Sequence, residues 1–336
     1  MNTKKRVFIV WKKYQRRVEV LAPYLDLEIF YFFYSWETKS KIFKVFSYFL
    51  NSINTMKCLF QNKPDLIFVQ YPPAPPLYCV ALYSWLTGTK YVSDCHMGIT
   101  VAHFLNWIYV KKLLARGNVI VHNEHLLEKT ATILKVRPFV VRDGIAKKRS
   151  TEVRESSFLD GLGLSPKKFV IFPCSYDPDE PVREVIEAAR LLPEMMFVMT
   201  WFSEKLSRNV RDSLPSNLLL TGYLQINDYD YIFANSGVAL VLTKNEDLQL
   251  SGMQEAMAFN IPAVVSDLKT TRFLYKDYPV FVKNNSKSIA LGVSYAFRNR
   301  MDLEERMKRL RIESEKEFFD QIENLKSSLN FESLGK

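Results

Sequence analysis

Two carboxylates, Asp247 and Glu255, lie eight residues apart between two short apolar runs. The runs are residues 238–242 and 262–266, and both have the length of a buried strand. The segment between them is therefore expected to open the helix of a βαβ unit, with both acids near the end of the first strand.

Ser251 and Gln254 have the spacing of a capping box, which predicts a helix from about Gly252 to Phe259. The backbone N–H groups at such a helix start suit a diphosphate. Ionised Glu255 could accept hydrogen bonds from vicinal sugar hydroxyls, so together these features predict a nucleotide-sugar pocket. The alternative is an ordinary amphipathic helix with two solvated acids.

This segment resembles the E-x7-E region of retaining GT-B glycosyltransferases of family 4 and its relatives, with Asp247 and Glu255 in the two acidic places. The resemblance implies that Glu255 holds the donor ribose and that Asp247 lies near the transferred sugar. It also implies a GT-B architecture, in which two Rossmann-like domains face an interdomain cleft.

Two further loops follow predicted strands of the first half. Residues 70–76 hold four prolines in five positions, which makes a stiff loop. Residues 94–98 place Asp94 and His96 two positions apart, where the pair could bind an acceptor or transfer a proton. The alternative is that each is structural.

These loops, Gln-x-Pro-Pro-x-x-Pro and Asp-x-His, are similar to those of the cytosolic-face β-1,4-mannosyltransferases of N-glycan assembly and their bacterial relatives. Residues 175–181 resemble the Ser-Trp-x-Pro-Asp-Glu loop of the same enzymes. Gln15-Arg16-Arg17 is similar to the Gln-Arg element of some bacterial polysaccharide glycosyltransferases. The resemblance implies that Arg16, Arg17 and Tyr71 bind the acceptor.

Other positions of the expected donor site both follow and depart from the family pattern. Thr221-Gly222-Tyr223 fits the turn that lies near the nucleobase in GT-B enzymes. Ser175 and Glu180 stand where family 4 enzymes commonly carry Arg and Lys for the diphosphate, and residues 200–203 replace a Gly-x-Gly. Ser251, Gly252, Lys244 and Arg142 are then expected to meet the diphosphate charge, with Ser175 nearby.

The sequence has no D-x-D at a strand end of the first half, so we expect no metal and no cofactor besides the UDP- or GDP-linked sugar. If transfer inverts the anomeric centre, His96 or Asp94 is the candidate general base. If transfer retains it, the leaving phosphate itself can act as the base. Both outcomes stay open.

The chain of 336 residues alternates short β-rich runs with longer helical stretches, which is typical of an α/β fold with parallel sheets. No G-x-G-x-x-G follows the first strand of either half, which argues against a dinucleotide enzyme. The expected strands are residues 7–11, 28–32, 66–70, 91–94, 119–122 and 139–141, then 169–172, 196–200, 218–221, 238–242, 263–266 and 280–282.

These runs predict an N-terminal acceptor domain over residues 1–147 and a C-terminal donor domain over residues 148–312. Residues 146–157 are polar and resemble a linker. Residues 301–330 show an apolar stripe at helical spacing, and the resemblance implies that residues 313–336 form a helix packing back on the N-terminal domain. A solvated terminal helix is the alternative.

Four cysteines are scattered without C-x-x-C spacing in apolar surroundings, so we expect reduced thiols in the core. The apolar run 7–11 is too short for a signal peptide, and no apolar segment reaches the ~18 residues of a membrane span. The longest, residues 77–86, is expected to be a buried helix. We therefore expect a cytoplasmic protein.

The net charge of +10 is divided unevenly. Residues 1–150 hold 23 Lys and Arg against 9 Asp and Glu (+14), whereas residues 151–336 hold 23 against 27 (−4). The first half is thus expected to face an anionic partner, such as phospholipid, a lipid diphosphate or nucleic acid. No nucleic-acid-binding motif accompanies the charge, so nucleic acid is not expected.

Lysines alternate with aromatic residues in the segment 29–50. From Thr38 onward it predicts either an amphipathic helix in a membrane interface or a core helix with a lysine-rich solvent face.

The sequence as a whole predicts a metal-independent glycosyltransferase, peripheral at the inner face of the membrane. It would transfer a sugar to a lipid-linked or growing saccharide acceptor in polysaccharide or glycoconjugate biosynthesis. The alternative is a non-catalytic GT-B subunit that binds a partner glycosyltransferase or the membrane.

Overall fold

The computed structural model describes residues 5–95, 99, 102–145, 157–175, 177–200, 211–246 and 248–330. The chain divides into two compact units, Met1–Gly144 with Lys316–Lys336, and Ile145–Glu315. Most of the expected linker, residues 146–156, lies outside the described residues. Among the helices that are described, none is long and apolar enough to cross a membrane.

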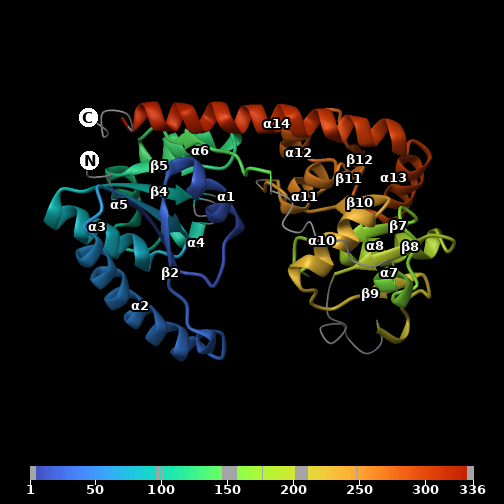
Figure 1. The fold of residues 1–336 in the computed structure, drawn as a ribbon, viewed down its shortest axis with the longest axis horizontal. Coiled ribbons are helices and arrows are strands. Elements are labelled where there is room, and N and C mark those ends of the chain that lie inside the picture. Colours follow the sequence, from blue (N-terminus) through green and yellow to red (C-terminus); the bar gives the residue numbers. More distant parts are fainter. Residues whose placement is uncertain are drawn as a thin grey trace. The chain divides into compact units, whose positions relative to one another are not determined.

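The first unit contains a parallel sheet of six strands, drawn in blue to green in Figure 1. In order across the sheet, the strands are β2 (Glu28–Tyr31), β1 (Arg6–Val10), β3 (Leu66–Tyr71), β4 (Lys90–Cys95), β5 (Asn118–Val121) and β6 (Phe139–Val140). All neighbouring pairs are parallel. Strand β3 is buried along its whole length, which explains its continuous apolar run.

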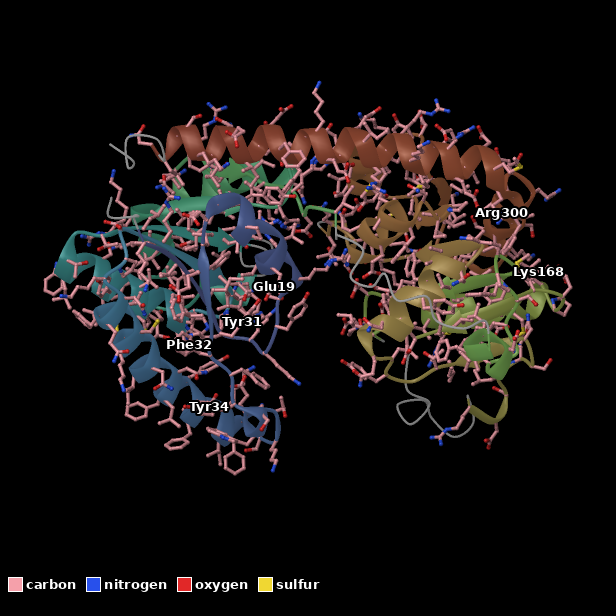
Figure 2. The ribbon with its side chains drawn as sticks, in the orientation of Figure 1. Glu19, Tyr31, Phe32, Tyr34, Lys168 and Arg300 are labelled. Atoms are coloured by element: carbon pink, nitrogen blue, oxygen red, sulfur yellow. The ribbon has the colours of Figure 1, made fainter. Side chains whose placement is uncertain are left out.

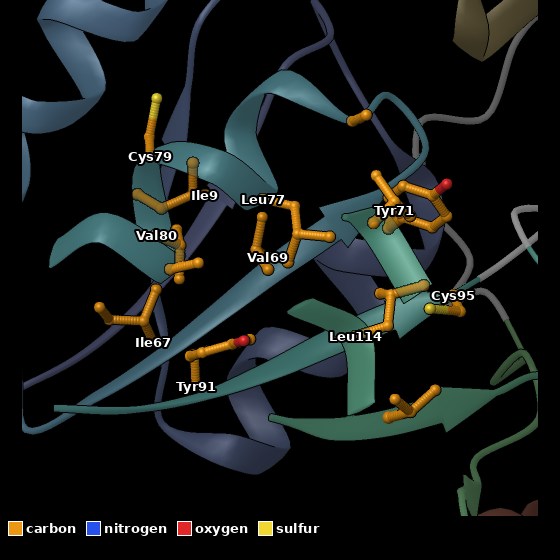
Figure 3. Close-up of a cluster of buried hydrophobic side chains, with 14 of the residues drawn as sticks. Ile9, Ile67, Val69, Tyr71, Leu77, Cys79, Val80, Tyr91, Cys95 and Leu114 are labelled. Atoms are coloured by element: carbon orange, nitrogen blue, oxygen red, sulfur yellow. The ribbon is translucent and has the colours of Figure 1, made fainter. Parts of the chain in front are cut away.

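Helices cover both faces of this sheet because alternate strand residues point to opposite sides. Ile67, Val69 and Tyr71 pack into one cluster, part of which is drawn in Figure 3, whereas Leu66 and Phe68 pack into the other. The helices before the domain boundary are α1 (Arg16–Leu25), the 3-10 turn η1 (Ser35–Thr38), α2 (Lys41–Asn62), α3 (Pro75–Thr87), α4 (Ala102–Leu105), α5 (Val110–Arg116) and α6 (His125–Leu134).

The second unit repeats this architecture with a second parallel sheet of six strands. In order across the sheet, they are β12 (Val280–Val282), β11 (Ala263–Ser266), β10 (Val238–Val241), β7 (Phe169–Phe172), β8 (Met196–Met199) and β9 (Leu218–Leu220). Its helices are α7 (Ser157–Gly161), α8 (Val182–Leu191), α10 (Ile226–Asn235), α11 (Ser251–Phe259), α12 (Lys269–Tyr275) and α13 (Ser286–Arg298). Two apolar clusters again lie on opposite faces of the sheet.

The long helix α14 (Arg300–Ser328) contributes to the cores of both units. Met307 and Leu310 are buried in the second unit, whereas Phe318, Ile322 and Leu325 are buried against α1 and the sheet of the first. The alternative of a solvated terminal helix is therefore wrong.

The predicted α/β fold is confirmed, and each expected strand occurs within one or two residues of its predicted ends. All four cysteines are buried thiols. The helix expected over residues 77–86 occurs as α3, but it is not wholly buried, because Leu82, Trp85 and Leu86 are exposed near its end.

Candidate functional site

The sheet of the second unit reverses its strand order between β7 and β10. Strands β8 and β9 continue on one side, and β11 and β12 continue on the other. In open α/β sheets, ligands bind outside the carboxyl ends of the strands at such a switch point. This carboxyl edge is therefore the expected ligand site of the second unit.

The N-terminus of α11 lies against this switch point. A Cβ atom added to Gly252 would lie 3.2 Å from Cγ of Pro173, which follows β7, and 3.2 Å from both methyl groups of Val241, which ends β10. Glycine thus permits the close approach of the helix start to both strands, and the helix dipole is directed at the ligand position of the fold.

Helix α11 begins at Ser251, one residue earlier than predicted, and Leu250 occupies the N-cap position. The predicted capping box is wrong because Ser251 is the first helical residue, and none of the described side chains caps the helix. Gln254 is buried instead, and its Oε1 accepts no hydrogen bond from the described residues. The uncapped first turn retains backbone donors suited to a phosphate.

Glu255 lies one turn into α11 and is half-buried. Tyr229 Oη, on the neighbouring helix α10, donates a hydrogen bond to Glu255 Oε2. A carboxylate can accept about four hydrogen bonds, so sugar hydroxyls can bind to Glu255 alongside Tyr229. Tyr229 thus orients the carboxylate that the sequence singled out.

A chain of hydrogen bonds runs along the same edge of the sheet. Thr243, just after β10, donates from its hydroxyl to Asp179 Oδ2 at 2.5 Å and from its amide to Ser266 Oγ at 2.9 Å. Ser266 Oγ donates to Asn284 Oδ1 at 2.7 Å. These bonds connect the ends of β7, β10, β11 and β12 and hold the edge rigid.

Lys244 is the residue directly after Thr243. Its amide donates to the carbonyl oxygen of Asp179 at 2.7 Å, and its Nζ lies 3.4 Å from Oε1 of Glu184. The ammonium group is therefore at the switch point, as expected for a diphosphate contact, but it is already close to one carboxylate.

The loop after β7 is organised around Glu180. The amides of Ser175 and Asp177 both donate to its carboxylate, at 3.1 Å and 2.9 Å to Oε2. Ser175 Oγ donates to Asp177 Oδ2 at 3.0 Å. Glu180, which stands where family 4 enzymes commonly carry a lysine, thus accepts hydrogen bonds from backbone N–H groups that could otherwise bind an anion.

The turn expected near a nucleobase follows β9, the edge strand. Gly222 has a φ of +67°, which favours glycine, and Tyr223 is exposed. Strand β8 separates this turn from β7, so Gly222 and Tyr223 lie at the edge of the sheet and not at the switch point.

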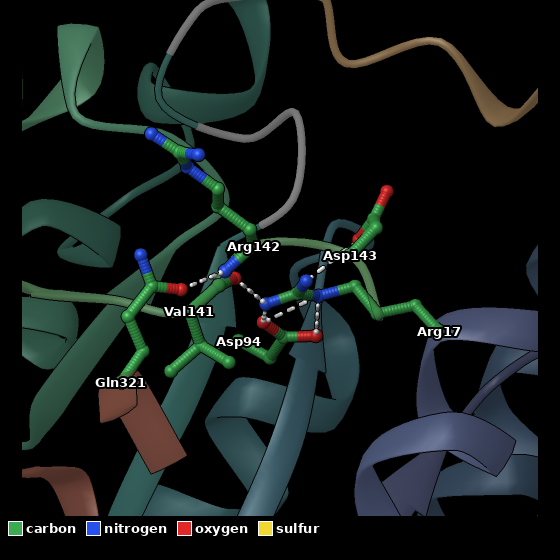
Figure 4. Close-up of polar contacts among 6 residues, drawn as sticks. All are labelled: Arg17, Asp94, Val141, Arg142, Asp143 and Gln321. Atoms are coloured by element: carbon green, nitrogen blue, oxygen red, sulfur yellow. Dashed lines mark hydrogen bonds and ion pairs between the residues drawn. The ribbon is translucent and has the colours of Figure 1, made fainter. Parts of the chain in front are cut away.

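A buried charge cluster occupies the carboxyl edge of the first unit's sheet (Figure 4). Arg17 donates to both oxygens of Asp94 at 3.0–3.1 Å, to Asp143 Oδ1 at 2.6 Å and to the carbonyl oxygen of Val141 at 2.8 Å. Burial alone would lower the pKa of Arg17, but the two carboxylates outweigh it and raise that pKa above its ordinary value. Arg17 therefore stays charged.

The remaining predicted acceptor residues lie at the switch point of this sheet, between β1 and β3. Arg16 is half-buried at the start of α1, and Tyr71 is buried at the end of β3. Tyr71 Oη donates to the carbonyl oxygen of Phe104 at 2.7 Å, and burial raises the pKa of the phenol. Arg17 and Tyr71 are both too buried to meet an acceptor in this conformation.

Arg142 lies between Glu124 and Glu317, with which it forms salt bridges within the first unit. Its amide donates to Gln321 Oε1 at 2.8 Å, so it also holds the end of α14 in place (Figure 4). Its expected role at the diphosphate stays a prediction.

The structure brings Ser251, Gly252, Lys244 and Ser175 to one switch point, with Glu255 one turn along α11. His96 and Asp247 lie outside the described residues. The sequence reasoning missed Tyr229 and Thr243. Thr243 was detectable as the polar residue after a buried strand, but no sequence signal marks Tyr229.

Within the described ranges, no group of three or more His, Cys, Asp or Glu side chains is placed to hold a metal ion. The expectation of metal-independent chemistry stays a prediction.

No protein-family model and no curated protein matches this chain. Among solved structures, Anabaena HepE in complex with UDP and glucose is similar, with a TM-score of 0.72 at 12% identity over 97% of this chain and 99% of HepE. A glycosyltransferase from Rickettsia africae ESF-5 has a TM-score of 0.72 at 12% identity, over 99% of both chains. The chain has the GT-B fold.

A solved structure that is named for a different reaction is also similar. A Listeria monocytogenes protein assigned as a UDP-N-acetylglucosamine 2-epimerase has a TM-score of 0.62 at 12% identity, over 91% of both chains. At such low identity, the likeness shows the GT-B fold and not the reaction.

Proposed function

We propose that this protein is a glycosyltransferase that transfers a hexose from a UDP- or GDP-linked donor. The observation that carries the proposal is the uncapped start of α11 at the switch point of a GT-B fold, with Glu255 one turn further along and bonded to Tyr229. This arrangement pairs a diphosphate position with a hydroxyl-binding carboxylate at the distance of one helical turn.

In the proposed reaction, the bond between the anomeric carbon and the diphosphate oxygen breaks and a bond to the acceptor oxygen forms. The start of α11 and Lys244 stabilise the negative charge on the leaving diphosphate, without a metal ion. The acceptor proton passes to a general base if the centre inverts, or to the leaving phosphate if it is retained. Because Asp94 already accepts three hydrogen bonds from Arg17, His96 is the better candidate base.

We further propose a lipid-linked or growing saccharide acceptor and a position at the cytoplasmic face of the membrane, in polysaccharide or glycoconjugate biosynthesis. Support comes from the charge of +14 over residues 1–150 and from the resemblance of the loops after β3, β4 and β7 to β-1,4-mannosyltransferases of lipid-linked oligosaccharide assembly. An anionic acceptor or surface is the complement of such a charge.

A second candidate is a non-catalytic GT-B subunit that binds a partner glycosyltransferase or the membrane. Two observations favour it: Glu180 accepts hydrogen bonds from the backbone donors of the loop after β7, and Lys244 lies close to Glu184. Both features reduce the positive potential available to a diphosphate.

A screen of nucleotide sugars by thermal shift tests the proposal. A UDP- or GDP-sugar should raise the melting temperature of the purified protein, and Glu255→Ala should weaken that donor's binding by about 100-fold, as expected for two lost charge-assisted hydrogen bonds. Exposed Glu305 provides the control, since Glu305→Ala should bind the donor like the wild type.

Product analysis with the best donor then separates the rival reactions. Release of nucleoside diphosphate with a glycosylated product supports the transferase, and activity in EDTA supports metal independence. An epimerised nucleotide sugar would instead indicate an epimerase. Donor binding without turnover on saccharide and lipid acceptors would favour the non-catalytic subunit, and failure to bind any nucleotide sugar would refute the proposed function.

A further inference from the structure

Helix α2 buries polar residues along its first four turns and exposes most of its large apolar residues. The residues buried against the rest of the first unit are Ser47, Asn51, Thr55, Cys58 and Leu59. Trp11 Nε1 donates to Thr55 Oγ1 at 2.9 Å, so a polar contact fixes this orientation. A helix on the surface of a globular protein normally has the opposite arrangement.

The exposed side of α2 carries an apolar stripe. Its large side chains recur at steps of three, four and seven residues, which places them on one helix face: Ile42, Val45, Phe46, Phe49, Ile53 and Phe60. Its ends, Ile42 and Phe60, are 18 residues apart, or ~27 Å at the rise of an α-helix. Figure 2 shows side chains projecting outward along this helix. A stripe of this length exposed to water indicates a binding surface.

Positive charge accompanies the stripe. Between Thr38 and Pro64 the chain has five lysines and no Asp or Glu. All five are exposed: Lys39, Lys41, Lys44, Lys57 and Lys63. Lysine side chains can extend their charged ends toward phosphate groups while their methylene stems lie along an apolar face.

Aromatic side chains extend the same surface near the start of α2. Near its start, Trp36 stacks on Tyr34 at 4.9 Å between ring centroids and contacts Phe46 at 5.8 Å. Near the end of α2, the exposed Phe60 packs edge-on against the buried ring of Tyr83 in α3, at 5.1 Å between ring centroids, so the core holds this part of the stripe in place. Tryptophan and tyrosine are the residues that favour the boundary between lipid head groups and acyl chains.

We propose that this apolar face of α2 lies in the interface of an anionic phospholipid bilayer, parallel to the membrane plane. The stripe enters the acyl boundary, and the lysines contact the head-group phosphates. The exposed stripe contradicts the alternative of a core helix with a lysine-rich solvent face, because such a helix would bury it, and the membrane interface is the proposal that remains.

A second copy of the chain fits this surface less well. A symmetric dimer through the α2 face would bring the five lysines of each chain together with no acid in the same segment to balance them. An anionic bilayer would both remove the apolar stripe from water and balance the charge of the lysines.

This inference deepens the proposed function by assigning the surface that reaches the membrane, but its test does not depend on catalysis. The purified 336-residue protein is tested by flotation with vesicles of phosphatidylcholine containing 25% phosphatidylglycerol. We expect the protein to bind these anionic vesicles, to bind them more weakly at 0.5 M salt, and not to bind vesicles of pure phosphatidylcholine.

The double variant Phe46→Ser, Phe49→Ser should lower the partition coefficient at least about tenfold, because two buried phenyl groups are removed from the acyl boundary. Its matched control is Leu291→Ser, Met301→Ser, which replaces side chains 69% and 81% exposed on the second unit and should leave binding unchanged. All four positions are exposed, so circular dichroism melting curves should match the wild type.

Charge is tested separately. Lys41→Glu with Lys44→Glu should lower binding about tenfold or more at low salt, whereas Lys168→Glu with Lys287→Glu, on the second unit, should change it little. Either of two outcomes would overturn the inference: wild-type protein that stays off anionic vesicles, or α2 variants that bind them like the wild type. A dimer that dissociates in the α2 variants would assign the face to a second copy.

Nucleotide-sugar thermal shift in the same variants keeps the two proposals apart. Donor binding should be unchanged, since the α2 residues belong to the first unit and α11 to the second. If no donor binds while vesicle binding depends on α2 as described, the proposed function fails and the membrane surface stands.

Discussion

The guanidinium group of Arg17 forms a bidentate salt bridge with the carboxylate of Asp94 at the carboxyl edge of the first sheet, with Nε 3.0 Å from Oδ2 and Nη2 3.0 Å from Oδ1. Both groups are buried. Because Asp143 also contacts the guanidinium, a single cation balances two carboxylates, one near the end of β4 and one just after β6. This cluster ties α1 to the sheet, so we assign Arg17 a positioning role.

The replacement Asp94→Asn should lower the free energy of unfolding by about 3 kcal/mol, because it removes the main counter-charge of a buried cation. Urea denaturation measures this loss. Since the pKa of Arg17 is raised above its ordinary value, its stabilising charge is fully present below about pH 12, and the deficit should be constant from pH 6 to 9.

Asp26→Asn is the control, because that carboxylate is exposed and lies 3.5 Å from Arg6. It should change stability by less than about 0.5 kcal/mol. Equal effects of the two replacements would show that the Arg17 cluster does not stabilise the fold.

The strands were predictable because parallel strands with helices on both faces are buried along their length, as β3 is, and therefore appear as uninterrupted apolar runs. The start of α11 was predicted to within one residue from the Ser-x-x-Gln spacing at Ser251 and Gln254. Its cap was not predictable, because Ser251 and Leu250 differ in role by a single position of the backbone.

The partners of the site residues could not be predicted in the same way. Arg17 and Asp94 are 77 residues apart, and Tyr229 and Glu255 are 26 apart on different helices. The periodicity of the segment that forms α2 also predicted an amphipathic helix, but it did not indicate which side of that helix is buried. The contact of Thr55 with Trp11, a tertiary interaction, makes the polar side the inner one.

The cysteines should be unreactive in the folded protein. Burial raises the pKa of Cys58, Cys79 and Cys95, most strongly for Cys95, and the thiolate is the reactive form. A colorimetric thiol reagent should therefore label none of these three between pH 7 and 9 and should label all of them in urea.

The raised pKa values of these three thiols also affect the stability of the fold. The unfolded thiols lose their protons near pH 8.5, whereas the folded thiols keep theirs, so the free energy of unfolding should fall as pH rises above about 8.5. Rapid labelling of native protein, or stability that rises through this range, would contradict the burial of these thiols.

Tyr229→Phe should weaken donor binding about fivefold, since it removes the hydrogen bond that orients the Glu255 carboxylate and leaves the ring in place. Isothermal titration with the donor that gives the largest thermal shift measures the change. Tyr231→Phe, on the same helix, is the matched control and should bind like the wild type. If Tyr229→Phe also binds normally, Glu255 is oriented without it.

Gly252→Ala tests the close approach of α11 to the switch point. The new methyl group would lie 3.2 Å from Pro173 and Val241, so the helix start must move by a few tenths of an ångström. We expect a loss of about 1 kcal/mol in stability by urea denaturation, together with weaker donor binding by titration, because the diphosphate donors move with the helix. Gly161→Ala, in α7, has nothing within 4 Å of its added methyl and should be neutral or slightly stabilising. Unchanged stability and donor affinity in Gly252→Ala would mean that the start of α11 is not held against these strands and is not the diphosphate site.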